Sequence, residues 1–327
     1  LTEFFVCLNK NSDLYPGVQQ GDNGQTITLG GVDRDGKDAV NELTYLVLRV
    51  SRDLEMIDPK INLRINSHTP LDLLSLATEL TRKGLGFPQY SNDEVVIPGL
   101  VAHGYDVQDA RDYVVAACWE FIIPGKGMDV VNIGAVSFPA AVDEALRTGL
   151  LVGEDLETVF KRVEANINQQ VDALASAYDK LLLPPAPYLS ALMPDCLENG
   201  RDLSNGSAYN NFGIHGAGSA NAADALAAVE ELVWSKKSIR PADLLVALEA
   251  NYVGHEVLRK NLIDSGPKVG NDDQRADTIL IRLFDLFADA CERYCRNSRG
   301  GILRPGSGSA MYYIWLAKGR EGMREPV

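Results

Sequence analysis

The acidic balance of this 327-residue chain excludes several kinds of partner before any motif is considered. It has 45 acidic and 31 basic residues, a formal net charge of −14, whereas nucleic acids and anionic membranes attract basic surfaces. The apolar share of 46% is ordinary for a globular protein, and no apolar run approaches the ~18 residues that suggest a membrane span. We therefore expect a globular protein that binds neither nucleic acid nor membrane.

The first half of the chain alternates predicted helices with short strands. Residues 12–37 are rich in Gly, Asp, Asn and Gln and are predicted to form loops. Apolar positions at helical spacing then predict a helix over 38–56, and strict alternation predicts a half-buried strand over 61–66. Further predicted elements are a helix from Pro70, a strand over 87–90, a helix capped at Asn92 and another helix from Asp106.

The second half, beyond Gly127, is predicted to be strongly helical. Helices are expected over 155–183, where the proline-rich residues 184–187 end the pattern, and over 222–234, 242–263 and 273–295. Loops are expected over 199–220 and from Arg299 to Gly308. Short strands between long helices indicate an α/β architecture, and because no linker is visible, we expect residues 1–327 to form a single domain.

Cysteine usage indicates the redox setting of the protein. The five cysteines are Cys7, Cys118, Cys196, Cys291 and Cys295. An odd number at irregular spacing is typical of reduced thiols and indicates a cytoplasmic location. Cys291 and Cys295 would share one face of a helix, but no second pair of ligands stands nearby. We expect them to be packing residues and predict no metal site.

The chemistry of the chain is concentrated in residues 114–125, where Cys118 and Glu120 interrupt an apolar run that ends in Pro-Gly. Burial raises the pKa of both a thiol and a carboxyl group. A neutral thiol is a poor polar nucleophile but can donate a hydrogen atom, and a carboxyl group titrating near neutrality suits a general base. Buried cysteines are more often inert core residues, so the segment alone leaves both interpretations open.

Motifs on both sides of this segment follow one another in a specific order. They are Gly86-Phe87-Pro88, Asn92-Asp93-Glu94, Ile97-Pro98, Asp109-Ala110-Arg111-Asp112-Tyr113, Cys118-x-Glu120, Pro124-Gly125-Lys126, Asn210-Asn211-Phe212-Gly213-Ile214-His215-Gly216 and Pro267-Lys268-Val269-Gly270-Asn271-Asp272-Asp273. The set resembles the glycyl radical enzymes and covers most of the chain.

This resemblance implies part of a ten-stranded β/α barrel, with Cys118 on an interior loop that meets a glycyl radical. It also implies a small-molecule substrate, a radical-SAM activating enzyme, a homodimer and no bound cofactor. The Arg-Val-x-Gly-Tyr signature of the radical glycine is not found. We therefore expect residues 1–327 to be an internal fragment of the barrel that lacks the C-terminal glycine-loop region. The radical glycine would then lie outside this chain, and the fragment alone would be inactive.

Cys118-Trp119-Glu120 indicates the branch of the family. Pyruvate formate-lyase has adjacent cysteines and no such Glu, whereas Cys-x-Glu is similar to lyases of the dehydratase and decarboxylase type. The resemblance implies a Cys118 thiyl radical and Glu120 as general base, acting on a C–O, C–N, C–S or C–C bond. A pyruvate formate-lyase-like acyltransferase and a non-catalytic fragment remain as alternatives.

Four more residues are candidates for substrate binding: His215, Arg64, Trp119 and Asn210. His215 lies in a glycine-rich segment, where a turn residue bonded to the backbone is an equally good interpretation. Arg64 is most simply a strand residue paired with an acid, although it could bind a carboxylate or sulfonate. Trp119 would narrow the pocket beside Cys118, and Asn210 belongs to the asparagine-rich motif.

Overall fold

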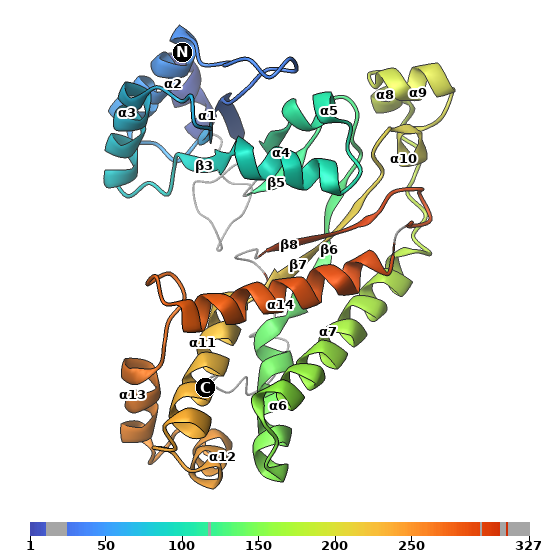
Figure 1. The fold of residues 1–327 in the computed structure, drawn as a ribbon. Helices are drawn as coiled ribbons and strands as arrows, with labels where there is room; N and C mark the ends of the chain where they lie inside the picture. The colour runs from blue at the N-terminus through green and yellow to red at the C-terminus, as the bar shows by residue number, and fades with distance from the viewer. Residues whose placement is uncertain (11–24, 117–118, 295, 308–311, 313–327) are drawn as a thin grey trace. The chain divides into compact units, whose positions relative to one another are not determined.

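The computed structural model describes residues 1–10, 25–116, 119–294, 296–307 and 312 (Figure 1). The chain divides into two compact units. The first contains Leu1–Gly127, Tyr188–Gly200 and Ser207–Tyr209, and the second contains Met128–Pro187, Arg201–Gly206 and Asn210–Val327. Each unit combines a parallel sheet with helices, as the predicted α/β class requires. That 1–327 form a single domain stays a prediction.

The first unit is built on a parallel sheet with strand order β1-β2-β3. The strands are β1 (Thr26–Gly30), β2 (Lys60–Ile65) and β3 (Gln89–Asn92). The predicted strand over 61–66 is therefore confirmed as β2, the central one. The prediction of loops over 12–37 is wrong for β1, whose alternating Thr-Ile-Thr-Leu is too short to stand out beside its polar neighbours.

The helices of the first unit are α1 (Thr2–Asn9), α2 (Glu42–Leu54), α3 (Leu71–Arg82), α4 (Asp93–Ala102), α5 (Val107–Arg111) and the short α8 (Pro187–Ser190) and α9 (Pro194–Asn199). Four of them, α2 to α5, agree with predicted ones, whereas α1, α8 and α9 were not predicted from the sequence. Asn41 caps α2 by accepting the N–H groups of Leu43 and Thr44. Leu63 of β2 is fully buried in one cluster with Leu73 of α3, so the sheet and its helices share one core.

The second unit is also built on a parallel sheet, with strand order β6-β7-β8. The strands are β6 (Val130–Ser137), β7 (Phe212–Ala217) and β8 (Leu303–Ser307). The loop predictions are wrong here, because β7 lies within 199–220 and β8 within 299–308. Glycines in β7 serve close packing: a Cβ on Gly213 would lie 2.1 Å from the Val131 carbonyl oxygen, and one on Gly216 would lie 2.2 Å from the Phe138 ring.

Most of the second unit outside this sheet is helical. They are α6 (Phe138–Val152), α7 (Leu156–Tyr178), α11 (Ser219–Val229), the π-helical turn η1 (Glu230–Ser235), α12 (Pro241–Glu249), α13 (Glu256–Ser265) and α14 (Gln274–Glu292), with the short α10 (Leu203–Gly206). The single helix predicted over 242–263 is wrong. Asn251 and Tyr252 have φ angles of 47° and 60°, which an α-helix does not allow.

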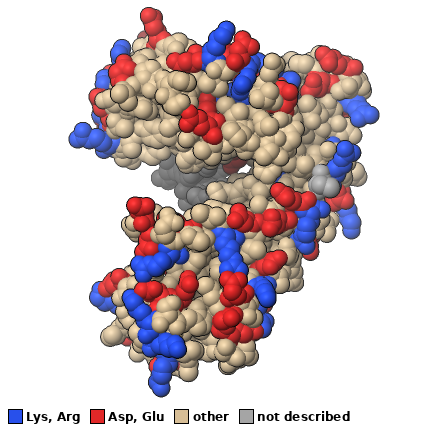
Figure 2. Space-filling model, in the orientation of Figure 1, with Lys and Arg blue, Asp and Glu red and all other residues tan. Residues whose placement is uncertain are grey.

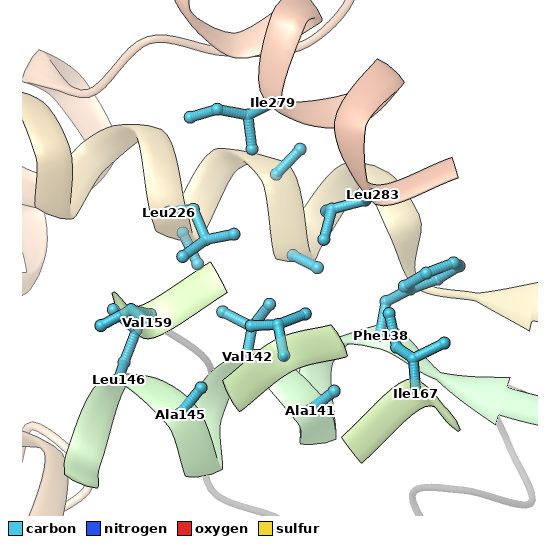
Figure 3. Close-up of a cluster of buried hydrophobic side chains, with 14 of the residues drawn as sticks. Phe138, Ala141, Val142, Ala145, Leu146, Val159, Ile167, Leu226, Ile279 and Leu283 are labelled. Carbon is cyan, nitrogen blue, oxygen red and sulfur yellow. The ribbon is translucent and has the colours of Figure 1, made fainter. Parts of the chain in front are cut away.

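Apolar side chains from four helices interlock in the core of this unit (Figure 3). Phe138, Val142 and Leu146 of α6 belong to the same buried cluster as Leu226 of α11 and Leu283 of α14. Alanines fill the positions between them, so the helices pack closely. Ile133 of β6 and Ile214 of β7 belong to the same cluster, so the helices and the sheet share one core.

Candidate active site

The segment with the predicted catalytic pair is framed by a short β-hairpin in the first unit. β4 (Val114–Ala116) pairs antiparallel with β5 (Glu120–Ile122), and Ala116 lies opposite Glu120. Positions 117–119 join the two strands. Cys118 itself lies outside the described residues, so its predicted closeness to Glu120 stays a prediction. The residues on both sides of it are strands and not a helix, as the i, i+2 spacing requires for side chains that share a face.

Glu120 is half-buried, and its carboxylate has a defined orientation. Its Oε2 accepts the backbone N–H of Trp119 at 2.9 Å. The donor belongs to the residue directly before β5, so this bond orients the carboxylate toward its own backbone. The Trp119 side chain is 50% exposed, so its predicted role in narrowing a pocket stays a prediction.

Buried contacts hold both strands of the hairpin. Val115 is 3% exposed and donates its N–H to Thr28 Oγ1 of β1 at 3.1 Å. The ring of Tyr113, directly before β4, meets the ring of Phe121 in β5 edge-on, with centroids 5.4 Å apart. Ile123, directly after β5, belongs to the same buried cluster as Tyr113 and Val115.

A buried ion pair lies at the start of the hairpin. Arg64 Nε and Nη2 donate to Asp93 Oδ1 and Oδ2 at 2.9 and 3.0 Å, and Tyr113 donates its hydroxyl to Oδ1 at 2.8 Å. Val32 N–H also donates to Asp93, at 2.9 Å. The guanidinium carbon of Arg64 lies 4.1 Å from the centroid of the Tyr113 ring. A Cβ on Gly31 would lie 2.5 Å from Arg64 Nε, so this approach requires glycine.

Arg64 therefore shows the simpler of its two predicted arrangements, a strand residue paired with an acid. Its side chain is 6% exposed and that of Asp93 is 3% exposed. Burial and the neighbouring Asp93 raise the pKa of Tyr113 above its usual range, so the hydroxyl stays a donor.

A second buried carboxylate lies at the end of the hairpin. Asp109 of α5 accepts from Lys126 Nζ at 2.8 and 3.0 Å, from Arg34 Nη2 at 3.1 Å and from the Tyr209 hydroxyl at 2.8 Å. Lys126 follows β5 in a turn whose backbone N–H bonds the carbonyl of Ile123. Asp109 thus ties the segment after β5 to the helix before β4.

His215 and Asn210 belong to the second unit. His215 is 6% exposed in the middle of β7, opposite Ala135 of β6, and its ring lies edge-on to that of Tyr312, with centroids 6.1 Å apart. The Asn210 backbone carbonyl accepts from the side chain of Asn297 at 2.9 Å. His215 is a strand residue and not the turn residue considered from the sequence. Roles for both in substrate binding stay predictions.

Sequence reasoning missed Asp93, Asp109, Tyr113 and Lys126 as functional candidates. All four lie in the ordered motifs around Cys118, which was the available signal, but partners far apart along the chain could not be paired from sequence. In the described part of the chain, His, Cys, Asp and Glu do not gather in groups of three that could hold a metal ion. Within the same residues, every helix is too short or too polar to cross a membrane.

Known proteins are similar in sequence to this chain over almost its whole length. The family model described as "Pyruvate formate lyase-like" matches residues 3–316. The (2S)-3-sulfopropanediol dehydratase of Klebsiella oxytoca is 36% identical over 315 residues, which cover 88% of this chain and 37% of that protein. The chain thus spans little more than a third of this relative's length.

Solved structures are similar to this chain's fold over most of its length. The glycerol-bound B12-independent glycerol dehydratase from Clostridium butyricum matches 100% of this chain and 46% of its own, with a TM-score of 0.83 and 26% identity. A glycyl radical enzyme from Archaeoglobus fulgidus matches 86% of this chain and 38% of its own, with a TM-score of 0.72 and 29% identity. These likenesses confirm the predicted fold class, part of an α/β barrel of the glycyl radical enzyme type.

Proposed function

Since the chain belongs to the pyruvate formate lyase-like family, we propose that it forms part of a glycyl-radical lyase acting on a small polar substrate. The observation that carries the proposal is the Cys118-x-Glu120 motif of the sequence, whose Glu120 begins β5 with its carboxylate oriented by Trp119 N–H. The dehydratase from Klebsiella oxytoca, 36% identical, supports a lyase.

In the proposed reaction, a glycyl radical takes the hydrogen atom from the Cys118 thiol and leaves a thiyl radical. The thiyl takes a hydrogen atom from a substrate carbon that also carries a hydroxyl. Glu120 removes the hydroxyl proton as general base, and the group on the neighbouring carbon leaves with its bonding electron pair, after which Glu120 releases the proton to the leaving group or to water. The product radical then takes back the hydrogen atom from Cys118, which restores the thiyl. The bond broken is C–O, C–N, C–S or C–C, according to the leaving group.

The radical resides, in this proposal, on a glycine outside residues 1–327, because the sequence contains no Arg-Val-x-Gly-Tyr. The protein itself supplies the radical, and no other cofactor is needed. A radical-SAM activating enzyme would generate it, and the assembled enzyme would be a homodimer. The free thiols of Cys7, Cys196 and Cys291 agree with a reducing compartment, for which we propose the cytoplasm.

Glu120→Gln in the full-length, activated enzyme tests the proposed mechanism. The variant keeps the shape of the side chain and removes the base, so we expect normal glycyl radical content and turnover lower by about 10²–10⁴-fold. Electron paramagnetic resonance measures the radical and product formation measures turnover in the same sample. The matched control is Glu79→Gln, which removes an exposed carboxylate paired with Arg52 and should keep normal turnover.

Two outcomes would count against the proposal. Near-normal turnover in Glu120→Gln would remove Glu120 from the mechanism and favour an acyltransferase of the pyruvate formate-lyase type, which needs no base at this position. An activated wild-type enzyme without any glycyl radical would favour a non-catalytic protein.

A further inference from the structure

The β4–β5 hairpin lies between two buried carboxylates whose partners come from distant parts of the sequence. Asp93 is 3% exposed and Asp109 is 4% exposed. Buried charges are expensive unless they are paired and hydrogen-bonded, and both groups accept from several donors. The proposed reaction uses neither Asp93 nor Asp109. The free-energy penalty of burying these two charges therefore suggests that the carboxylates have another role.

The Asp93 contacts converge on the residue before β4. Tyr113 donates its hydroxyl to Asp93, and its backbone carbonyl accepts from Arg64 Nη1 at 3.3 Å. Arg64 comes from the central strand β2 and Asp93 from the first turn of α4. Tyr113 is therefore fixed at both its backbone and its side chain to two rigid elements of the sheet and helix layers.

The Asp109 contacts converge on the residues after β5. Lys126 donates to both carboxylate oxygens, and it is connected to Ile123 through a tight turn. Tyr209 donates to the same carboxylate and stacks on Tyr105, with centroids 4.3 Å apart. The chain that leaves β5 is therefore also tied to a buried carboxylate, at the same open end of the hairpin where β4 begins, because Val114 pairs with Ile122.

We propose that Asp93 and Asp109 are positioning residues that fix both strands of the β4–β5 hairpin at its open end and thereby set the placement of Glu120. The inference rests on the proposed function for its catalytic consequence. Hydrogen-atom transfer needs reacting atoms in close contact, and small displacements of a catalytic group can lower the rate by about 10²-fold. Fixing both strands of a short hairpin at its open end limits such displacement.

The test uses Asp93→Asn and Asp109→Asn in the full-length enzyme, with Tyr113→Phe as a milder change that keeps the ring and removes one hydrogen bond to Asp93. The matched controls are Asp72→Asn and Tyr45→Phe. Tyr45 donates to Asp72 at 3.1 Å in an equivalent but exposed pair on α2 and α3.

The first measurement is amide hydrogen exchange of the unactivated protein, followed by mass spectrometry. We expect exchange in 113–123 to rise by about tenfold or more in the Asp variants, because hydrogen bonds to charged groups contribute enough for that factor. Tyr113→Phe should give a smaller rise, and the two controls should give none. Unchanged exchange in the hairpin would overturn the proposal, whatever the enzyme's activity.

The second measurement is kcat for each glycyl radical, together with KM. We expect kcat to fall by on the order of 10²-fold in the Asp variants and KM to stay the same, because the proposed mechanism uses neither carboxylate to bind substrate. A purely structural role would lower thermal stability and leave kcat per radical unchanged, which would overturn the proposal. If the wild type forms no radical, the proposed function fails, and the exchange measurement alone decides whether the carboxylates hold the hairpin.

Discussion

Asp109 keeps its charge in a buried position because its neighbours compensate for the loss of water. Burial alone would raise the pKa of this carboxyl, but hydrogen bonds from Lys126 and Tyr209 and the charges of Lys126 and Arg34 outweigh it and lower the pKa. Burial and the same carboxylate raise the pKa of Tyr209 to about 12. At neutral pH the pair is therefore an anion and a neutral hydroxyl donor.

The lowered pKa of Asp109 predicts a contribution to stability that disappears in acid. A carboxylate whose pKa is lower in the folded than in the unfolded state stabilises the fold above its ordinary value of 3.8. That stability is lost as the pH falls below ~4 and through the lowered pKa, because the folded state must then take up a proton. We expect Asp109→Asn to lower Tm at pH 7 and to differ less from wild type at pH 3, measured by thermal unfolding across this range.

Asp72→Asn is the control for this pH dependence, because its carboxylate is exposed. A difference between Asp109→Asn and wild type that stays constant from pH 7 to pH 3 would contradict the prediction.

For Arg64, the sequence predicted the kind of partner but not which residue it is. The alternation of β2 placed it on a strand, and an acidic partner was expected from chemistry alone. The partner, Asp93, is 29 residues away, at the end of the next parallel strand along the sheet. Strand order decides which acid meets which base, and a single sequence contains no signal for strand order. The pairing of Asp109 with Lys126 depends instead on the β4–β5 hairpin, which returns the chain toward α5.

At the scale of elements, α14 joins the second unit's core to α7. Its Leu283 is fully buried, and Arg282 beside it donates to both oxygens of Glu157 of α7, at 2.6 and 2.7 Å. The Arg282 guanidinium carbon also lies 3.8 Å from the centroid of the Phe160 ring. The helix thus combines one buried apolar face with one charged edge.

Leu283→Ala should destabilise the second unit by about 2–5 kcal/mol, because it leaves a cavity in a closely packed core. The matched control is Ile281→Ala on the same helix, where the side chain is 60% exposed and the change should stay within about 0.5 kcal/mol. Urea denaturation followed by circular dichroism, with amide exchange of α14, measures both. Equal effects of the two substitutions would contradict the observed orientation of α14.

Elements were predictable from sequence where one periodicity dominated. The long helix expected over 155–183 is present as α7, because its apolar positions keep a steady helical spacing, but it ends at Tyr178 and not at the proline-rich residues. β7 was missed because Gly213 and Gly216 are typical of loops by composition, whereas here they let neighbouring atoms approach. For the β4–β5 hairpin, the spacing of Cys118 and Glu120 predicted a non-helical segment, which agrees with Glu120 in β5, but the pairing of β4 with β5 needed the structure.

At the scale of the whole molecule, charge is distributed and not concentrated. On the face drawn in Figure 2, acidic and basic side chains of the described residues are intermingled. Exposed ion pairs such as Arg240–Asp243 and Lys260–Asp264 contribute to this pattern. Such pairs add little stability, but they offset basic groups that could otherwise attract polyanions, in a chain whose formal net charge is −14.

The chain alone, residues 1–327, should form no glycyl radical and catalyse no turnover when it is treated with a radical-SAM activating enzyme. Turnover needs a radical that takes the hydrogen atom of Cys118, and the proposed radical glycine lies outside these residues. The chain spans 37% of the Klebsiella oxytoca dehydratase, which supports the expectation that other segments take part.

Electron paramagnetic resonance after activation is the measurement, with that full-length dehydratase and its own activating enzyme as positive control. Circular dichroism must first show that the chain is folded. A glycyl doublet or product from 1–327 would place the radical glycine within this sequence and contradict the proposed arrangement.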